Sequence, residues 1–222
     1  MQSNSVLVAL AGNPNCGKTT VFNSRTGSRQ HVGNWPGKTV EKKEGRFSFD
    51  HTEVRVVDLP GAYSLGAYSE DEVVARDFVL TEKPDVVVNV LDATNLNRNL
   101  YMTVQLLEMG AGVVLALNMY DELKTRGMKL DAAELSRRLG APIIPTVAVR
   151  RQGMKELVAQ AIALAKQGRK PPLRIDYGPA LEEAIAPLAD YIASLGGETS
   201  RLSPRWLALK ALEGDENILR LI

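Results

Sequence analysis

Residues 12–19 constrain the fold of this chain more than any other segment. They read G-N-P-N-C-G-K-T and fit the pattern G-x-x-x-x-G-K-[S/T], a loop that cradles nucleotide phosphates. The apolar run at residues 6–11 predicts a buried strand before the loop, and residues 19–23 predict the start of a helix after it. The glycines let backbone N–H groups turn toward phosphates, and the helix N-terminus adds positive potential. The segment therefore predicts a strand, a phosphate-binding loop and a helix in succession.

Each residue type in the loop has an expected task. Lys18 can reach the β- and γ-phosphates, and the Thr19 hydroxyl can bind Mg²⁺. The expected phosphate contacts comprise Gly12, Asn13, Pro14, Asn15, Cys16, Gly17, Lys18, Thr19 and Thr20. Cys16 is the single cysteine, so no disulfide can form within the chain. It is either a redox switch, with a thiolate favoured by the helix N-terminus, or only a small loop residue.

Composition narrows the class of protein. The chain has 222 residues, of which 45% are hydrophobic and 24% charged, as in a soluble globular protein. The 27 Lys and Arg residues nearly balance the 26 Asp and Glu residues, which argues against a broad nucleic-acid-binding surface. No apolar run approaches the roughly 20 residues that span a bilayer, and no signal peptide is evident. We expect this chain alone to be soluble. Whether it is a fragment of a longer protein is left as an open alternative.

Strand and helix patterns alternate up to about residue 167, which predicts an α/β fold with a mostly parallel sheet flanked by helices. The predicted strands are residues 6–11, 54–57, 86–91, 113–117 and 143–147, with residues 39–49 forming a hairpin that turns at residues 50–51. Asp131 predicts the cap of a helix that ends near Gly140. The segment 168–172 is expected to be a linker. Patterns beyond it are helical only, so we predict a nucleotide-binding domain at 1–170 and a small helical domain at 171–222.

Two motifs that follow strands indicate which nucleotide binds. Asp58 and Gly61, in D-L-P-G, follow one strand, where the carboxylate can bind Mg²⁺ directly or through water and the Gly61 N–H can touch the γ-phosphate. Asn118, Met119 and Asp121 follow another strand. The Asp121 carboxylate can accept hydrogen bonds from N1–H and the N2 amine of guanine, and adenine offers neither donor. Asn118 is expected to bridge the phosphate loop and the base pocket.

Two further segments have both a functional interpretation and an ordinary structural one. Ala148, between Val147 and Val149, falls where a small residue can contact guanine through its backbone N–H, or it is a loop filler. Thr39, near Gly37, lies in a segment that could be mobile. Its hydroxyl is expected to be a second Mg²⁺ ligand and its N–H to sense the γ-phosphate, unless it is an ordinary strand threonine.

The order and spacing of these motifs resemble a Ras-like GTPase over residues 5 to about 165. One part is missing, because Ala62 and Tyr63 follow the D-L-P-G motif where a glutamine would orient the attacking water. Intrinsic hydrolysis is therefore expected either to be slow or to use another element. Asn15 can lend its side-chain oxygen to K⁺ beside the phosphates, with backbone carbonyls of Gly33 and Trp35 completing the shell. Otherwise Asn15 is a small polar loop residue.

A narrower resemblance, to the cytoplasmic GTPase domain of the FeoB ferrous-iron transporters, covers nearly the whole chain. It is carried by residues 12–20, 26–30, 32–37, 39–41, 58–65, 92–96, 98–101 and, in the helical part, 205–215. The resemblance implies GTP and GDP as ligands, Mg²⁺, and activation by K⁺ at Asn15. Lys18, Asn15, Thr39 and Gly61 would form the catalytic machinery. Two mobile segments are implied, switch I at residues 30–41 and switch II at residues 62–72.

The resemblance also implies a setting and partners. The whole protein would carry a membrane region that moves Fe²⁺ into a bacterial cytoplasm, with this chain at the cytoplasmic face of the inner membrane. That membrane region would be its partner. Small accessory proteins and a second copy of the chain in a homo-oligomer are further possible partners, and no nucleic-acid partner is expected. The helical domain would act like an inhibitor of nucleotide dissociation. With only His31, His51 and one cysteine, we expect no dedicated Fe²⁺ site.

Several positions depart from the family pattern. Ala148 stands where a serine is frequent, Lys38 replaces an apolar residue before Thr39, and Arg25 lies at a usually apolar helix position. Trp35 is predicted to be exposed in its loop, either touching a partner or packing within the switch. The rival hypothesis is a soluble K⁺-dependent GTPase acting on tRNA or ribosomes, and a third is a nucleotide-binding module with negligible turnover.

Overall fold

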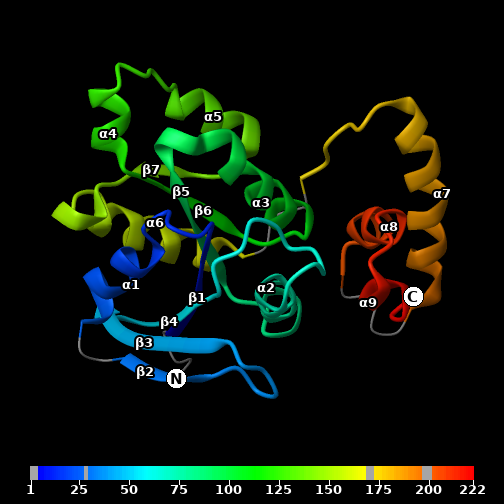
Figure 1. Ribbon diagram of the computed structural model, residues 1–222, viewed down its shortest axis with the longest axis horizontal. Helices are drawn as coiled ribbons and strands as arrows, with labels where there is room; N and C mark the ends of the chain where they lie inside the picture. The colour runs from blue at the N-terminus through cyan, green and yellow to red at the C-terminus, as the bar shows by residue number, and fades with distance from the viewer. Residues whose placement is uncertain (1–4, 28–29, 169–172, 197–201) are drawn as a thin grey trace.

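The computed structural model describes residues 5–27, 30–168, 173–196 and 202–222. The predicted boundary between residues 170 and 171 lies outside these ranges. The chain forms a sheet flanked by helices, with a group of helices from the C-terminal part beside it (Figure 1). The predicted α/β class with a helical C-terminal part is therefore confirmed.

Within the described ranges, seven strands form one mostly parallel sheet in the order β2-β3-β4-β1-β5-β6-β7. The strands are β1 (Ser5–Gly12), β2 (Gln30–Asn34), β3 (Glu41–Phe49), β4 (Thr52–Asp58), β5 (Val86–Asp92), β6 (Val113–Asn118) and β7 (Ile143–Pro145). The pairs β2–β3 and β3–β4 are antiparallel, and the other neighbouring strands of this sheet run parallel. The central strands are apolar throughout because helices cover both faces of the sheet, as parallel sheets require. The predicted strands are all present, although the last one ends at Pro145 rather than at residue 147.

The β3–β4 hairpin confirms the predicted turn at residues 50–51. Asp50 and His51 both have positive φ, 49° and 60°, as a two-residue turn of type I′ requires. Strand β2 was not predicted. Its sequence Q-H-V-G-N carries a single apolar residue, Val32, which is exposed, so neither alternation nor hydrophobicity marks it. Its antiparallel pairing with β3 makes it a strand, at the edge of the sheet.

The helices cover the two faces of the sheet and build the C-terminal part. They are α1 (Lys18–Thr26), α2 (Glu70–Thr81), α3 (Leu96–Glu108), α4 (Tyr120–Thr125), α5 (Ala132–Leu139), α6 (Met154–Gln167), α7 (Pro179–Leu195), α8 (Pro204–Leu212) and α9 (Glu216–Leu219), with the 3₁₀ turns η1 (Ala93–Asn95) and η2 (Ala148–Arg150). Phe22 of α1 and Leu157 of α6 pack on one face, and Phe78 of α2 and Leu106 of α3 on the other. Arg25 lies partly buried on the α1–α6 face, beside a cavity of about 40 Å³, and burial lowers the pKa of its guanidinium.

Local capping signals place several helix ends as predicted. Asp131 accepts a hydrogen bond from the Glu134 N–H at 2.9 Å, and Gly140 ends α5 with a positive φ. Ser203 caps α8 by accepting from the Trp206 N–H at 3.3 Å. The short helix α9 was not predicted, because four residues are too few for a periodic pattern.

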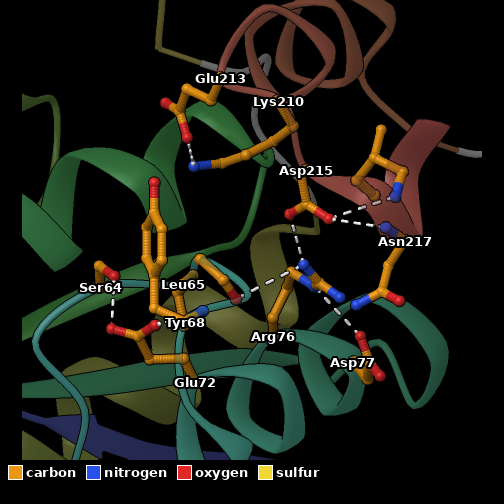
Figure 2. A network of polar contacts seen from close by, with 12 residues as sticks. Ser64, Leu65, Tyr68, Glu72, Arg76, Asp77, Lys210, Glu213, Asp215 and Asn217 are labelled. Atoms are coloured by element: carbon orange, nitrogen blue, oxygen red, sulfur yellow. Dashed lines mark hydrogen bonds and ion pairs between the residues drawn. The ribbon is translucent and has the colours of Figure 1, made fainter.

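The C-terminal helices have a core of their own and lie beside α2 and α3 (Figure 1). Ile185, Ile192, Trp206 and Ile218 are buried in this core, and Leu80 of α2 packs against it. Polar contacts also join the two parts: the Arg76 Nη1 donates to the Asp215 Oδ2 at 2.7 Å, and both side chains are almost fully buried (Figure 2). Among the described residues, no helix combines the length and apolar character needed to cross a bilayer.

Candidate nucleotide-binding site

The glycines of the phosphate loop are required by close contacts. Gly12 and Gly17 have φ values of 154° and 91°, which disfavour other residues. A Cβ at Gly17 would lie 2.2 Å from the Asn118 Nδ2, and one at Gly12 would lie 2.6 Å from the Val90 carbonyl oxygen. Glycine at positions 12 and 17 therefore lets the loop backbone pass close to β5 and to the end of β6, where a side chain would clash.

Residues from three strand ends converge on this loop. Gly12 ends β1, Asp58 ends β4 and Asn118 ends β6, so all lie at the carboxyl edge of the parallel strands. Ligands of open α/β sheets bind at this edge. The Ala62 N–H donates to the Gly12 carbonyl oxygen at 3.3 Å, which holds the D-L-P-G segment against the loop. A Cβ at Gly61 would lie 3.4 Å from the Pro14 Cα, so Gly61 lies directly beside the phosphate loop.

Lys18 and Asp58 form a close ion pair across the site. The Lys18 Nζ lies 2.5 Å from the Asp58 Oδ1, and both side chains are largely buried. Burial raises the pKa of the Asp58 carboxyl, and the adjacent ammonium opposes that shift. The contact holds the Lys18 ammonium at the loop, with its charge balanced by the Asp58 carboxylate.

The residues present fit a magnesium ion at this point. Thr19 is an exposed residue in the first turn of α1, and the Asp58 carboxylate lies next to Lys18. Hydroxyl and carboxylate oxygens are the donors that Mg²⁺ prefers.

Asn118 connects the phosphate loop to the segment expected to hold the base. Its Nδ2 donates to the Cys16 carbonyl oxygen at 2.9 Å, and its Oδ1 accepts from the Ala148 N–H at 3.0 Å. The Ala148 N–H is therefore engaged by Asn118 in this structure, although a role toward guanine was expected. Val149 beside it is 79% exposed.

Asp121 stands at the outer side of the same region. Met119 has a left-handed backbone, φ 57°, and directly precedes α4, which carries Asp121 in its first turn. The Asp121 Oδ2 lies 3.6 Å from the Nη2 of Arg150, and both side chains are partly exposed. Sequence reasoning gave Arg150 no role, and only its place two residues after Ala148 could have pointed to it. A base bound at Asp121 would compete with this loose ion pair.

Thr39 is placed away from the predicted magnesium ligands. Its Oγ1 donates to the Glu70 Oε2 at 3.0 Å, at the start of α2, and the Lys38 Nζ lies 3.8 Å from the Glu70 Oε1. In Figure 1 the turn between β2 and β3 lies near the lower edge, well below the loop between β1 and α1. The structure therefore does not join Thr39, or its neighbour Gly37, to Thr19, and their expected contacts stay predictions.

The prediction that Trp35 is exposed was wrong. Trp35 is only 9% exposed and packs edge-on against Phe78 of α2, with the ring centroids 5.4 Å apart. The Trp35 N–H donates to the Val40 carbonyl oxygen at 2.9 Å, and this closed turn directs the indole onto α2. The local sequence pattern around Trp35 could not predict this contact, because Phe78 lies 43 residues further along the chain.

The predicted K⁺ shell is not assembled in this arrangement. Asn15 is exposed in the phosphate loop and has a positive φ of 66°. Gly33 lies in β2, which β3 and β4 separate from β1 by three strand spacings, about 14 Å. The Trp35 carbonyl oxygen accepts from the Lys38 N–H at 3.0 Å. Switch I would have to leave its hairpin for these carbonyls to reach Asn15.

Arg98 is a residue near the site to which sequence reasoning gave no role. Its guanidinium carbon lies 3.8 Å from the centre of the Tyr63 ring, a cation–π contact with the residue that follows the D-L-P-G-A segment. Its carbonyl oxygen accepts from the Asn13 Nδ2 at 3.3 Å. Arg98 thus touches both the phosphate loop and switch II. No motif marks such a contact, because it joins segments 35 and 85 residues apart.

The Cys16 thiol is expected to react slowly. It is buried, and burial raises its pKa to about 11. At pH 8 only about a thousandth of such a thiol is ionised, and the thiolate is the nucleophile. Iodoacetamide at pH 8 should modify native protein at least about tenfold more slowly than urea-unfolded protein, as followed by mass spectrometry. Equal rates would instead support a redox switch.

The comparisons with known proteins agree on a family. The family model "Ferrous iron transport protein B" matches residues 6–161, and "FeoB cytosolic helical domain" matches residues 177–222. A Fe(2+) transport protein A/Fe(2+) transporter FeoB fusion protein of Porphyromonas gingivalis is 45% identical over 221 residues, 98% of this chain and 26% of that relative. The Fe(2+) transporter FeoB of Escherichia coli K12 is 45% identical over 212 residues, 94% of this chain and 27% of its own length. The chain thus spans about a quarter of the length of these curated relatives.

Solved structures extend the likeness to the fold. The cytosolic domain of the T. maritima FeoB iron transporter in a GDP form has a TM-score of 0.90 and 41% identity, covering 97% of this chain and 83% of that one. The same domain in its GMPPNP form has a TM-score of 0.89 and 42% identity, covering 97% and 84%. Motifs, sheet order and both family models therefore agree, and the chain belongs to the family of ferrous iron transport protein B.

Proposed function

We propose that this chain is the GTP-binding and GTP-hydrolysing regulatory domain of a bacterial Fe²⁺ membrane transporter, activated by K⁺. One observation carries the proposal most directly. The Asn118 side chain joins the phosphate loop at Cys16 to the Ala148 segment, and Asp121 follows three residues later. Such a bridge couples phosphate binding to base selection. The related T. maritima domain has been solved in GDP and GMPPNP forms, which supports the nucleotide.

The proposed chemistry relies on positioning and charge. Lys18 and the N–H groups of the phosphate loop hold the β- and γ-phosphates, and Asp121 selects guanine by accepting from its N1–H and N2 amine. The Lys18–Asp58 contact of 2.5 Å opens so that the ammonium turns to the phosphates. Thr19, and Asp58 through water, would hold Mg²⁺. That ion would neutralise charge on the β- and γ-phosphate oxygens.

Switch I has to move for this site to be completed. Thr39 would leave Glu70 and reach the phosphates, and Gly33 and Trp35 would leave the hairpin so that their carbonyls join Asn15 around K⁺. The Lys38–Glu70 contact at the tip is exposed and weak, whereas the buried Trp35 side chain and the β2–β3 pairing also hold the hairpin, so nucleotide and ion binding would have to offset the cost of moving it. Hydrolysis would release the segment again, as in other nucleotide switches.

The proposed setting follows from the longer relatives. This chain covers about a quarter of each, and they are named Fe(2+) transporters. We place the domain at the cytoplasmic face of the bacterial inner membrane, with the transporter's membrane region as partner and Fe²⁺ as cargo. Among the side chains that the structure describes, no three of His, Cys, Asp or Glu gather to hold a metal ion.

Single-turnover kinetics test the function. Excess protein is mixed with radiolabelled GTP or ATP in MgCl₂ and KCl, and phosphate release is followed. We expect hydrolysis of GTP and none of ATP, and Lys18→Ala should remove at least about 99% of the rate because it deletes a transition-state charge. Equal use of ATP would refute guanine selection. Tight GTP binding without turnover would leave only a nucleotide-binding module.

A further inference from the structure

Two side chains of switch I contact one carboxylate of α2. The Thr39 Oγ1 donates to the Glu70 Oε2 at 3.0 Å, and the Lys38 Nζ lies 3.8 Å from the Glu70 Oε1. The two contacts therefore use both oxygens of the same side chain, which lies 31 residues beyond Thr39. Sequence reasoning gave Glu70 no role. Its contacts restrain the segment that has to move in the proposed function.

The start of α2 holds the Glu70 side chain in place. Glu70 is the first residue of this helix, and the Ser69 side chain caps the helix by accepting from the Glu72 N–H at 3.2 Å. The Glu72 carboxylate in turn accepts from the Ser64 hydroxyl at 2.6 Å and from the Tyr68 N–H at 3.2 Å (Figure 2). A negative charge in the first turn of a helix is also favoured by the helix dipole. Glu70 therefore extends from a fixed helix start toward switch I.

The position of Thr39 at Glu70 excludes its proposed position at the nucleotide. In the proposed function the Thr39 hydroxyl joins Mg²⁺ and its N–H senses the γ-phosphate, so Thr39 has to leave Glu70 first. GDP has no γ-phosphate for Thr39 to contact. A ligand that gains only from a minor arrangement binds more weakly in proportion to the population of that arrangement. Contacts that stabilise the present arrangement therefore weaken GTP and leave GDP unchanged.

The rest of the hairpin leaves room for Glu70 to matter. Trp35 packs against Phe78, which stabilises the present arrangement. The Trp35 indole nitrogen is buried, however, and has no hydrogen-bond partner among the described residues, so its lost hydration opposes that gain. The Lys38 and Glu70 side chains are each 42% exposed. An exposed ion pair together with a hydrogen bond to a carboxylate favours one arrangement by a factor of about three to ten.

We propose that Glu70 is a positioning residue that restrains switch I and thereby lowers the preference of this chain for GTP over GDP. The inference rests on the proposed function, because it takes Thr39 to complete the GTP site. Glu70 acts only through Lys38 and Thr39 and touches neither the nucleotide nor the metal ion. Lys38 contributes through its charge, since an apolar side chain at this position could not pair with Glu70.

Single-turnover hydrolysis in MgCl₂ and KCl over a range of protein concentrations tests the proposal. The initial slope of the rate against protein concentration gives the hydrolysis rate constant divided by the dissociation constant for GTP. We expect Glu70→Ala to raise this quotient about three- to tenfold, while the affinity for a fluorescent GDP analogue stays within about twofold. Glu70→Gln keeps an oxygen that can accept from Thr39 but loses the charge that holds Lys38, so its gain should be smaller.

Asp71→Ala is the matched control. Asp71 is an exposed acid in the same first turn of α2, whereas the contacts of Lys38 and Thr39 go to Glu70. Its replacement should change the quotient less than about twofold. Equal gains from Glu70→Ala and Asp71→Ala would reveal a general effect of charge and overturn the proposal. No gain from Glu70→Ala, or a parallel gain in GDP affinity, would overturn it as well.

The unaltered chain separates this inference from the function on which it rests. If the unaltered chain hydrolyses no GTP under these conditions, the proposed function fails and the inference fails with it. If it hydrolyses GTP while Glu70→Ala behaves like Asp71→Ala, the proposed function stands and only the restraint by Glu70 is refuted.

Discussion

Replacing Asp121 with asparagine is expected to change the preferred base from guanine to xanthine. The carboxylate accepts two hydrogen bonds from guanine in the proposed site, and each hydrogen bond to a charged group is worth about 1.5–3 kcal/mol. Losing both should weaken GTP about 10²- to 10⁴-fold. Xanthine carries a carbonyl where guanine carries the N2 amine. The asparagine amide can donate to that carbonyl, so XTP should bind the variant more tightly than GTP.

Fluorescent GTP and XTP analogues give both affinities by direct titration. Glu122→Gln is the matched control, because it removes the neighbouring carboxylate of α4, which is 53% exposed and pairs with the exposed Arg126. That variant should bind GTP within about twofold of the unchanged chain. A similar loss of GTP affinity in the Glu122 and Asp121 variants, or no gain of XTP binding by Asp121→Asn, would refute Asp121 as the base-selecting residue.

Replacing Arg76 with alanine is expected to destabilise the chain by about 3–5 kcal/mol, because it leaves the buried Asp215 carboxylate without its partner. The Arg76 and Asp215 side chains are only 2% and 4% exposed, and their atoms lie 2.7 Å apart. The Arg76 Nη1 also lies 3.5 Å from the Gly66 carbonyl oxygen in switch II. The loss should therefore be felt both in switch II and in the packing of the C-terminal helices.

Urea unfolding followed by circular dichroism and by tryptophan fluorescence, to which Trp35 and Trp206 contribute, measures this effect. Arg220→Ala is the control, since Arg220 and Glu216 form an ion pair at 3.2 Å with side chains 76% and 81% exposed. Its removal should cost under about 0.5 kcal/mol. Asp215→Asn should recover part of the stability of Arg76→Ala, because the amide needs no counter-charge and its oxygen can still cap α9. Equal costs for Arg76→Ala and Arg220→Ala would show that the buried pair does not hold the two parts together.

Sequence reasoning reached furthest where local rules decide the structure. Local sequence patterns correctly predicted the apolar strands β1, β5 and β6. They also predicted the helix starts that Asp131 and Ser203 cap. The strand ends at Asp58 and Asn118 follow from the same patterns. Parallel strands have their carboxyl ends at the same edge of the sheet. The sequence alone therefore predicts that the motifs at these ends form one site.

Contacts between residues far apart in the chain could not be predicted from local sequence patterns. Strand β2 exists through its pairing with β3, and Trp35 is buried by Phe78 of α2. The Thr39–Glu70 and Arg76–Asp215 contacts join positions 31 and 139 residues apart. None of these partners leaves a periodic or motif signal near the residue it binds. The arrangement of switch I in particular is set by α2, which the sequence of the switch does not contain.

GTP hydrolysis by this chain in KCl and in NaCl at matched ionic strength, with and without Asn15→Ala, tests the proposed mechanism most directly. Asn15 lies exposed in the phosphate loop, and its side-chain oxygen is the proposed K⁺ ligand. We predict that K⁺ accelerates single-turnover GTP hydrolysis at least about tenfold over Na⁺, and that Asn15→Ala abolishes the difference while GDP affinity stays within about threefold. Equal rates in the two salts, or a K⁺ effect that survives Asn15→Ala, would contradict it.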